Sequence, residues 1–259
     1  MIGTGPLSGT SVQVKAWRAL RTRAQREKQG RYLAEGEHLC GEAIREGRAL
    51  EILCQDDRQD KYGRLLTSGL PVHILSAGAF ALVSDTKTPQ GISALCRLPA
   101  QAALSALGPR LVALNAVQDP GNVGTILRTM DAAGFTGMLL DKDSADAFSP
   151  KALRAAMGAA FRLPLRVSED LAQDLHQLEG FAIIASQLDG DDFYARPPLG
   201  ERICLIVGNE GAGIAPQLSA LAGHRYRLPM PGRAESLNAA VAASVMIYDF
   251  IRVWGKAAL

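Results

Sequence analysis

Short aliphatic runs alternate with amphipathic stretches in the second half of this chain. The runs predict strands at Leu111–Val117, Met138–Leu140, Phe181–Ala185 and Ile203–Val207. Helical periodicity between them predicts helices at Asn122–Ala133, Pro150–Phe161 and Glu169–Glu179. Strands that are apolar throughout and alternate with helices indicate an α/β fold with a parallel sheet covered on both faces. Ligands of such sheets bind beyond the carboxyl ends of the strands, so the loops after Val117, Ala185 and Val207 are the candidate sites.

The first half of the chain contains both helical patterns and short apolar runs typical of strands. It predicts a helix at Gly36–Gly47 and strands at Leu50–Cys54, Val72–Leu75 and Ile92–Cys96. Small residues bracketed by prolines follow at Pro99–Pro109, a composition typical of a linker. The 259 residues correspond to about two domains. We therefore expect a small α/β domain at residues 1–98, a linker at 99–109 and a larger domain at 110–259.

Composition excludes several classes of protein. Hydrophobic residues make up 47% and charged residues 21%, which favours a packed core over disorder. No charge-free run approaches the ~18 apolar residues of a membrane span, and Met1–Gln13 has no apolar signal core. The four cysteines show no C-x-x-C spacing, so we expect neither zinc nor disulfides. These features predict a cytoplasmic protein with no membrane partner and no metal.

Positive charge is concentrated at the N-terminus. Residues 1–31 hold seven basic residues and one acid, or +6, which leaves −4 for the rest of a chain whose net charge is +2. A basic segment on an otherwise nearly neutral chain suggests binding to a polyanion such as nucleic acid. The alternative is a solvated helix face, because Arg and Lys are good helix formers.

The loop after the first predicted strand of the second half begins a helix. Asp-Pro-Gly is a turn sequence, Asn122 is a natural N-cap and Gly134 is a natural stop. Arg128 lies off the buried stripe and leans back over Gly124, which has no side chain to block it. The guanidinium is thereby aimed at the mouth of the sheet, where it suits an anionic substrate or a group that loses a proton. An ordinary surface arginine is the alternative.

The segment Val207–Gly213 surrounds Glu210 with glycines, so backbone and carboxylate can approach a ligand. It is not a dinucleotide fingerprint, because Pro216 stands at the third glycine position and only 46 residues follow Gly213. Glu210 is either a site residue or a carboxylate stabilised at the start of a helix.

A third segment runs from Tyr226 to Arg252. Pro229, Pro231 and Gly232 predict an irregular loop, and Ser236 can cap a long helix rich in small residues. Asn238 in the first turn is a poor helix former, so it either bonds locally or has a catalytic role.

Together these segments resemble motifs 1, 2 and 3 of the SpoU (TrmH-like) RNA ribose 2′-O-methyltransferases of the SPOUT class. The matching residues are Asn115…Gln118-Asp-Pro-Gly-Asn-x-Gly-x-Ile-x-Arg-Thr-x-x-Ala-x-Gly134, Ile206-Val-Gly-x-Glu-Gly-x-Gly213 and Leu228-Pro-Met-x-Gly-x-x-x-Ser-Leu-Asn238. The resemblance covers Leu111–Trp254. Arg21–Glu42, with Gly30–His38, is similar to the start of the family's L30e-like RNA-binding domain.

The resemblance implies a C-terminal α/β domain tied in a trefoil knot, an exception to the rule of unknotted chains. It implies S-adenosyl-L-methionine as cofactor, a homodimer formed through that domain, and no metal. Carried over to this sequence, the cofactor contacts backbone at Gly208, Leu228 and Leu237. The loop Ser186–Gly190, with Ser186 and Leu188, lines the pocket together with Met230.

Roles for the other motif residues follow from the same resemblance. Arg128 lies next to the ribose hydroxyl and either assists its deprotonation or stabilises the alkoxide and adjacent phosphate. A guanidinium is a very poor general base, which favours the electrostatic role. Asn122 and Asn238 hold the substrate and the arginine, Glu210 orients Arg128 or the third motif, and Ser236 fixes the loop over the cofactor. The expected RNA-binding residues are Arg21, Arg23, Arg26 and Arg31.

Ribosomal RNA of the 23S type is the expected substrate, because an L30e-like extension suggests a structured ribosomal target. A tRNA 2′-O-methyltransferase is an alternative, as is a base methyltransferase of the same class. A non-catalytic RNA-binding or ribosome-assembly protein that retains the fold is another. A nicotinamide enzyme is disfavoured by the broken glycine fingerprint.

Overall fold

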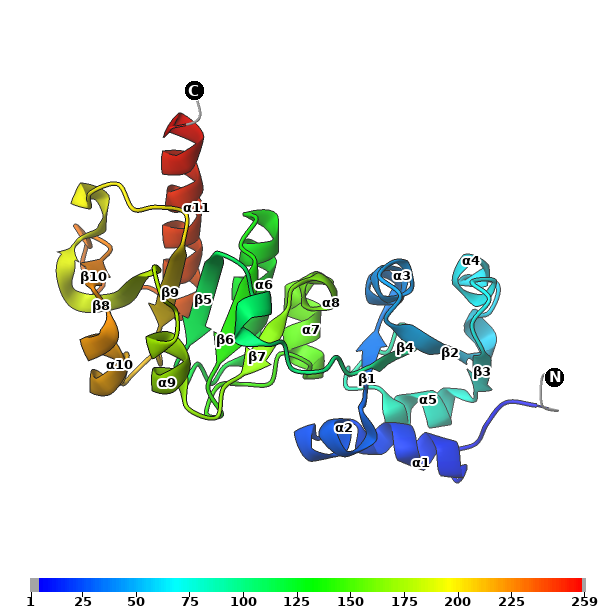
Figure 1. Cartoon of the computed structure of the whole chain (residues 1–259). Coiled ribbons are helices and arrows are strands. Elements are labelled where there is room, and N and C mark those ends of the chain that lie inside the picture. The colour runs from blue at the N-terminus through cyan, green and yellow to red at the C-terminus, as the bar shows by residue number, and fades with distance from the viewer. Residues whose placement is uncertain (1–4, 258–259) are drawn as a thin grey trace. The chain divides into compact units, whose positions relative to one another are not determined.

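The chain folds into two units, and one segment from the second half of the sequence belongs to the first unit. The computed structural model describes residues 5–257, so residues 1–4 of the expected basic segment lie outside it. Unit 1 comprises the chain up to Ala100 together with Asp146–Arg162, and unit 2 comprises Gln101–Ala145 and the chain from Leu163 onward. Figure 1 labels the helices and strands of both units. Residues 146–162 therefore pack with the first unit, although they lie within the range 110–259 that we expected for the second domain.

Unit 2 is built on a six-stranded sheet in which every pair of neighbours is parallel. The strand order is β10-β8-β9-β5-β6-β7. Their bounds are β5 Arg110–Leu114, β6 Gly137–Leu140, β7 Leu165–Val167, β8 Ala182–Asp192, β9 Ile203–Val207 and β10 His224–Arg227. Leu114 pairs with Leu140 on one side and with Val207 on the other, so these strands end at a common edge. This confirms the predicted parallel sheet.

Helices cover this sheet. They are α6 Pro120–Ala132, α9 Leu171–His176, α10 Pro216–Leu221 and α11 Ala239–Ala257, with short turns η2 Leu104–Ala106 and η3 Phe193–Ala195. One core cluster joins alternate strand residues to buried leucines of α9 and α10: Leu107, Leu111, Ala113, Leu139, Leu171, Leu175, Leu178, Cys204, Ile206 and Leu218. The helices α6 and α11 pack against each other. The predicted stripe of α6, formed by Val123, Ile126, Leu127 and Met130, is fully buried.

An irregularity in β8 shapes the functional edge of unit 2. Along β10, Arg225 pairs with Ala185 but Tyr226 pairs with Asp191, so residues 186–190 bulge out of the ladder. A Cβ on Gly190 would lie 2.6 Å from the carbonyl carbon of Arg225, so only glycine fits where the bulge closes. The predicted strand Phe181–Ala185 thus continues to Asp192 after the bulge.

Unit 1 has a four-stranded sheet in the order β1-β4-β2-β3. The strands are β1 Arg31–Glu35, β2 Ala49–Gln55, β3 Val72–Leu75 and β4 Ile92–Arg97, and only β2 and β3 pair in parallel. The helices are α1 Val12–Ala19, α2 Arg23–Gln29, α3 Glu37–Arg45, α4 Gly63–Leu66 and α5 Ala77–Val83, with η1 at Asp56–Arg58. Trp17, Leu53, Phe80 and Leu95 lie in its core.

The segment Asp146–Arg162 completes unit 1. It forms α7 Pro150–Ala156 and α8 Ala159–Arg162, whereas the sequence predicts one helix over Pro150–Phe161. The helix breaks because Met157 and Gly158 have φ of +50° and +94°. Phe148 and Phe161 pack against the buried ring of Tyr32, with centroids 5.0 and 6.3 Å from it. Unit 1 therefore depends on residues that come much later in the chain.

Candidate functional site

A cavity of about 510 Å³ lies in unit 2 among the loops at the ends of β8, β9 and β10. All six residues expected to bind the cofactor line it, namely Ser186, Leu188, Gly208, Leu228, Met230 and Leu237. Glu210 and Ser236 line it as well, and both are exposed. Two of the three predicted ligand loops, those after Ala185 and Val207, thus form its wall.

Close backbone packing shapes the wall after β9. Asn209 and Gly213 exchange backbone hydrogen bonds of 2.9 and 3.0 Å, and the Asn209 side chain accepts from the backbone N–H groups of Gly211 and Ala212 at 2.9 Å each. A Cβ on Gly208 would lie 2.4 Å from the carbonyl carbon of Gly213. The glycines of this segment therefore allow a tight hairpin that holds Glu210 at its tip.

Three side chains from distant segments meet beside the cavity. Asn122 Nδ2 donates to Glu210 Oε1 at 2.6 Å, and Asn238 Nδ2 donates to Asn122 Oδ1 at 3.1 Å. Glu210 and Asn238 are exposed and Asn122 is half-buried, so a ligand can reach this chain of hydrogen bonds. The three sequence motifs do converge on one place in unit 2.

The helix caps differ from those predicted. Asp119 caps α6 by accepting from the N–H of Gly121 at 2.5 Å, which leaves Asn122 inside the first turn with its amide free for Glu210. Asn238 Oδ1 accepts from the N–H groups of Ala240 and Val241, so Asn238 rather than Ser236 caps α11. The cap prediction was wrong because Pro120 fits the first turn and because the loop continues past Ser236.

A supporting network lies behind these groups, and its central residue, Asp141, was missed in the sequence. The carboxylate accepts from Asn115 Nδ2 at 2.7 Å and from the N–H of Ala116 at 2.9 Å. Ala116 has a φ of +53°, a costly conformation for a residue with a Cβ. Its carbonyl accepts from Asn209 Nδ2 at 2.8 Å. Asp141 directly follows β6, so its place at a carboxyl strand end was the available signal.

Arg128 stands apart from this arrangement within the single chain. It is exposed on α6, does not line the cavity, and makes no hydrogen bond or ion pair with any residue between 5 and 257. Its neighbour Thr129 hydrogen bonds to Ser244 of α11 at 2.9 Å, which places this part of α6 against α11.

Comparison with known protein families now assigns the chain. Residues 109–248 match the SpoU rRNA Methylase family, and residues 12–94 match an MRM3-like substrate binding domain. The chain belongs to the SpoU rRNA methylase family.

Similar proteins support this membership over nearly the whole chain. The 23S rRNA (guanosine(2553)-2′-O)-methyltransferase RlmP of Bacillus subtilis is 39% identical, with 93% of this chain and 96% of that protein covered. The AdoMet-bound rRNA methyltransferase of Sinorhizobium meliloti is 29% identical with a TM-score of 0.81, covering 95% and 98% of the two chains. The SpoU methyltransferase AviRb of Streptomyces viridochromogenes, in complex with AdoMet, is 25% identical with a TM-score of 0.83, covering 94% and 98%.

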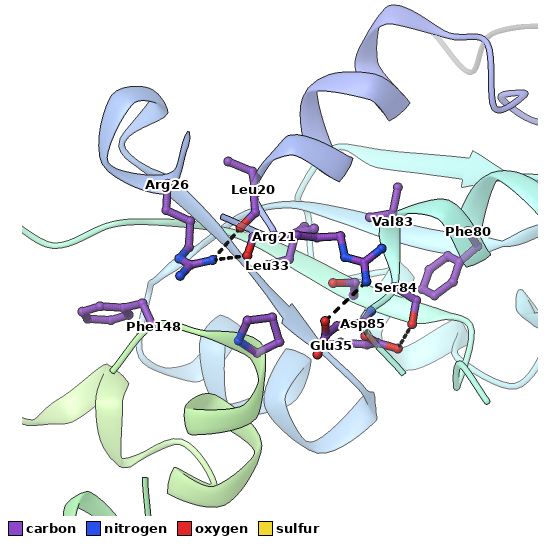
Figure 2. Close-up of a pocket in the computed structure, with 12 residues that line it drawn as sticks. Leu20, Arg21, Arg26, Leu33, Glu35, Phe80, Val83, Ser84, Asp85 and Phe148 are labelled. Atoms are coloured by element: carbon purple, nitrogen blue, oxygen red, sulfur yellow. Dashed lines mark hydrogen bonds and ion pairs between the residues drawn. The ribbon is translucent and has the colours of Figure 1, made fainter. Parts of the chain in front are cut away.

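In this SpoU family member, the arginines expected to bind RNA have acidic partners inside unit 1. Arg26 is buried and pairs with Asp146 at 2.5 Å, while it also donates to the carbonyls of Leu20 and Arg21 (Figure 2). Arg21 lies 3.6 Å from Asp85 (Figure 2). Arg23 bonds Glu27 at 2.9 Å and Arg31 lies 3.5 Å from Glu51. The structure therefore gives Arg26 a role in packing, whereas the other three keep exposed or half-buried side chains.

The cysteines do not line the cavity. The four cysteines are buried, and burial raises the pKa of Cys54 to about 11 and that of Cys96 to about 12. They are therefore neutral thiols in the cores. Over residues 5–257 no group of three or more metal-ligating side chains could hold an ion, and no helix there is long and apolar enough to cross a membrane.

Proposed function

We propose that this SpoU family member transfers a methyl group from S-adenosyl-L-methionine to a ribose 2′-hydroxyl of ribosomal RNA. The observation that carries the proposal is the convergence of Asn122, Glu210 and Asn238 beside the cavity lined by all six expected cofactor residues. Guanosine in 23S-type RNA is the substrate we propose, because it is the one named for the Bacillus subtilis relative.

The cavity fits the proposed cofactor in size and charge. Its volume of about 510 Å³ lies within the range of pockets for ligands of this size. Its charged lining residues are Asp189, Glu210 and Arg227, a net charge of −1 that complements the +1 of the sulfonium cofactor. Gln187 is fixed by Ser219 and Asp189, at 2.7 Å each, so the polar groups of the bulge are preorganised. Leu228, Met230 and Leu237 supply apolar surface for a purine ring.

The residues of this chain then perform positioning and charge stabilisation. When bound, S-adenosyl-L-methionine supplies a methyl group on a sulfonium, which is a good leaving group. The remaining tasks are to orient the ribose hydroxyl in line and to ease the loss of its proton to solvent water as the neutral thioether leaves. Asn122 and Asn238 hold the sugar, with Glu210 fixing the Asn122 amide. Arg128 stabilises the developing alkoxide and the neighbouring phosphate through the positive charge of its guanidinium.

We propose that the protein forms a homodimer and that each copy supplies its Arg128 to the cavity of the other. Val241 and Tyr248 lie seven residues apart on α11 with exposed fractions of 47% and 52%, an apolar face suited to a second copy. Ala239 and Ala242 next to Val241 line the cavity. Because α6 packs on α11, a second copy on this face would bring its Arg128 toward the cavity of the first. We also propose that residues 110–259 are tied in a trefoil knot, and the close backbone approaches at Gly190 and Gly208 support this.

Subunit mixing tests the proposed function. The Arg128→Ala variant should keep cofactor affinity but lose about 100-fold or more in kcat for tritium transfer to 23S rRNA. Mixed with a Gly208→Ala variant, at a cofactor concentration too low to occupy the weakened site of that variant, it should recover about a quarter of the normal rate, since half of random dimers carry one complete site. If the mixture recovers no activity, each active site takes its Arg128 from the same chain that binds its cofactor. Normal turnover by Arg128→Ala would remove it from the chemistry, and transfer to no RNA would overturn the function.

A further inference from the structure

A second cavity, of about 400 Å³, lies in unit 1 where β1, β2 and β3 begin and where α1 and α2 pass beside them. It is lined by Gln13, Ala16, Trp17, Gln29, Arg31, Glu51, Pro71 and His73. None of these residues belongs to the site in unit 2. The proposed methyl transfer therefore leaves this cavity without a role.

Aromatic and apolar groups form one part of this second cavity. The rings of Trp17 and His73 are in contact, with centroids 5.0 Å apart and a tilt of 59°. Trp17 is buried, His73 is half-buried and Pro71 is exposed at the rim. A flat apolar ligand can lie against these groups.

Fixed polar groups form the other part. Glu51 Oε2 is 2.8 Å from His73 Nε2, and Glu51 Oε1 is 3.5 Å from the guanidinium of Arg31. Gln29 donates through Nε2 to Gln25 at 3.3 Å, and Gln13 accepts from Ser11 at 3.4 Å. Within residues 5–257 the Gln29 Oε1 acceptor and the Gln13 Nε2 donor have no hydrogen-bond partner. An amide acceptor and an amide donor are the groups that read the edge of a nucleobase.

Positive charges without acidic partners occur on the same elements. Lys15 and Arg18 of α1 and Lys28 of α2 are exposed, and none pairs with a described acid. By contrast, Arg21, Arg23 and Arg26 of the same basic segment are paired away from the cavity. Arg31 lies 3.5 Å from Glu51 within the cavity itself, and its side chain is 46% exposed. The charges available to phosphates are therefore on the elements that form this cavity.

We infer that the second cavity binds an unstacked nucleotide of the RNA substrate. The base lies against Trp17, Pro71 and His73 with its edge on the glutamine amides, and the flanking phosphates contact Arg31 and Lys28. Sequence-reading RNA sites commonly hold splayed-out bases against aromatic rings, including that of His. The inference rests on the proposed function, because that function makes RNA the ligand.

Binding and kinetics with the full-length protein test this inference. His73→Ala and Arg31→Gln should each weaken binding of a 23S rRNA fragment and raise its KM by about 10-fold, with kcat at saturating RNA unchanged. Arg31→Gln should also reduce the salt dependence of log Kd by about one phosphate contact. The matched control Arg64→Gln, an exposed arginine of the same unit outside the cavity, should change neither value.

A readout that needs no methyl transfer separates this inference from the proposed function. In a Trp254→Phe background, Trp17 is the remaining tryptophan, and a single-stranded RNA hexamer should quench its fluorescence. Quenching that disappears in Arg31→Gln supports the site even if no methyl transfer is found. Unchanged RNA affinity and KM in both cavity variants, with thermal midpoints equal to that of the parent, would overturn it, as would an equal loss in Arg64→Gln.

Discussion

Single side chains beside the cofactor cavity form hydrogen bonds with two partners at once. Asn238 caps α11 through its oxygen and holds Asn122 through its nitrogen. Asn122 in turn connects Asn238 to Glu210. An amide can do this because it carries both a donor and an acceptor, which neither Asp nor Ser provides in the same geometry.

Replacement of Asn122 tests this link. Asn122→Ala should lower kcat by about 10- to 100-fold, because Glu210 and Asn238 lose their common partner, while cofactor affinity stays within about twofold. Single-turnover methyl transfer and calorimetric cofactor titration measure the two quantities. As the control, Thr125→Ala changes an exposed residue on the same helix. Equal kcat in both variants would contradict the role of the link.

The sequence identified both asparagines but assigned their hydrogen bonds incorrectly. Capping preferences are local, and they favoured Asn122 and Ser236 as caps. The observed cap of α6 is Asp119, three residues before Asn122, and that of α11 is Asn238, two residues after Ser236, which frees Asn122 for a contact 88 residues away in sequence. A contact at that separation has no local signal. Arg26 is a similar case, because its partner Asp146 lies 120 residues away.

At the scale of elements, the cofactor cavity depends on places where backbones nearly touch. Gly208→Ala should disrupt the hairpin after β9, because the added Cβ would lie 2.4 Å from backbone that cannot move aside easily. We expect cofactor binding to weaken by at least about 10-fold and the thermal midpoint of unit 2 to fall. Differential scanning calorimetry with and without cofactor measures both effects.

The chain offers a matched control for this glycine. A Cβ on Gly223, also in unit 2, meets nothing within 4 Å, so Gly223→Ala should leave cofactor binding and stability close to normal. If both variants lose cofactor binding and stability to a similar extent, the effect comes from replacing a loop glycine in general. The close backbone contact at Gly208 would then not be its cause.

Long buried strands were the most predictable elements. The strand at Ile203–Val207 matches its prediction, because an aliphatic run buried on both faces leaves little choice of structure. The strands β1, β7 and β10 were not predicted. β7 has only three residues, and β10 reads His-Arg-Tyr-Arg, so neither shows an aliphatic run. Their strands are fixed by neighbours in the sheet, which lie far away in sequence.

Ion pairs connect the late segment Asp146–Arg162 to the rest of unit 1. Glu42 bonds Arg162 at 2.6 Å and also pairs with Arg45. Burial alone would raise the pKa of Glu42, but the hydrogen bonds from both arginines outweigh it and hold the pKa below the usual 4.5. A lowered carboxyl pKa contributes stability above about pH 4.5, and this contribution is lost as the pH falls through the folded-state value.

Thermal unfolding at several pH values tests this connection. Glu42→Gln should lower the midpoint of unit 1 at pH 7, and the difference from the parent should shrink as the pH is reduced to about 3. Glu37→Gln, an exposed carboxylate on the same helix, is the control and should show little difference at either pH. A difference that persists or grows in acid would contradict the assignment.

Because Asp146–Arg162 completes unit 1, the chain passes between the units after residues 100, 145 and 162. Chimeras that exchange RNA-recognition modules among SpoU relatives by a single crossover near residue 100 would leave the new module facing an unrelated second piece. Tyr32 would then meet foreign partners in place of Phe148 and Phe161. Successful recombination, in the laboratory or in evolution, therefore requires that the chain up to Ala100 and Asp146–Arg162 are exchanged together. Substrate choice in this architecture is then encoded by two separate segments of the gene that must be inherited as a pair.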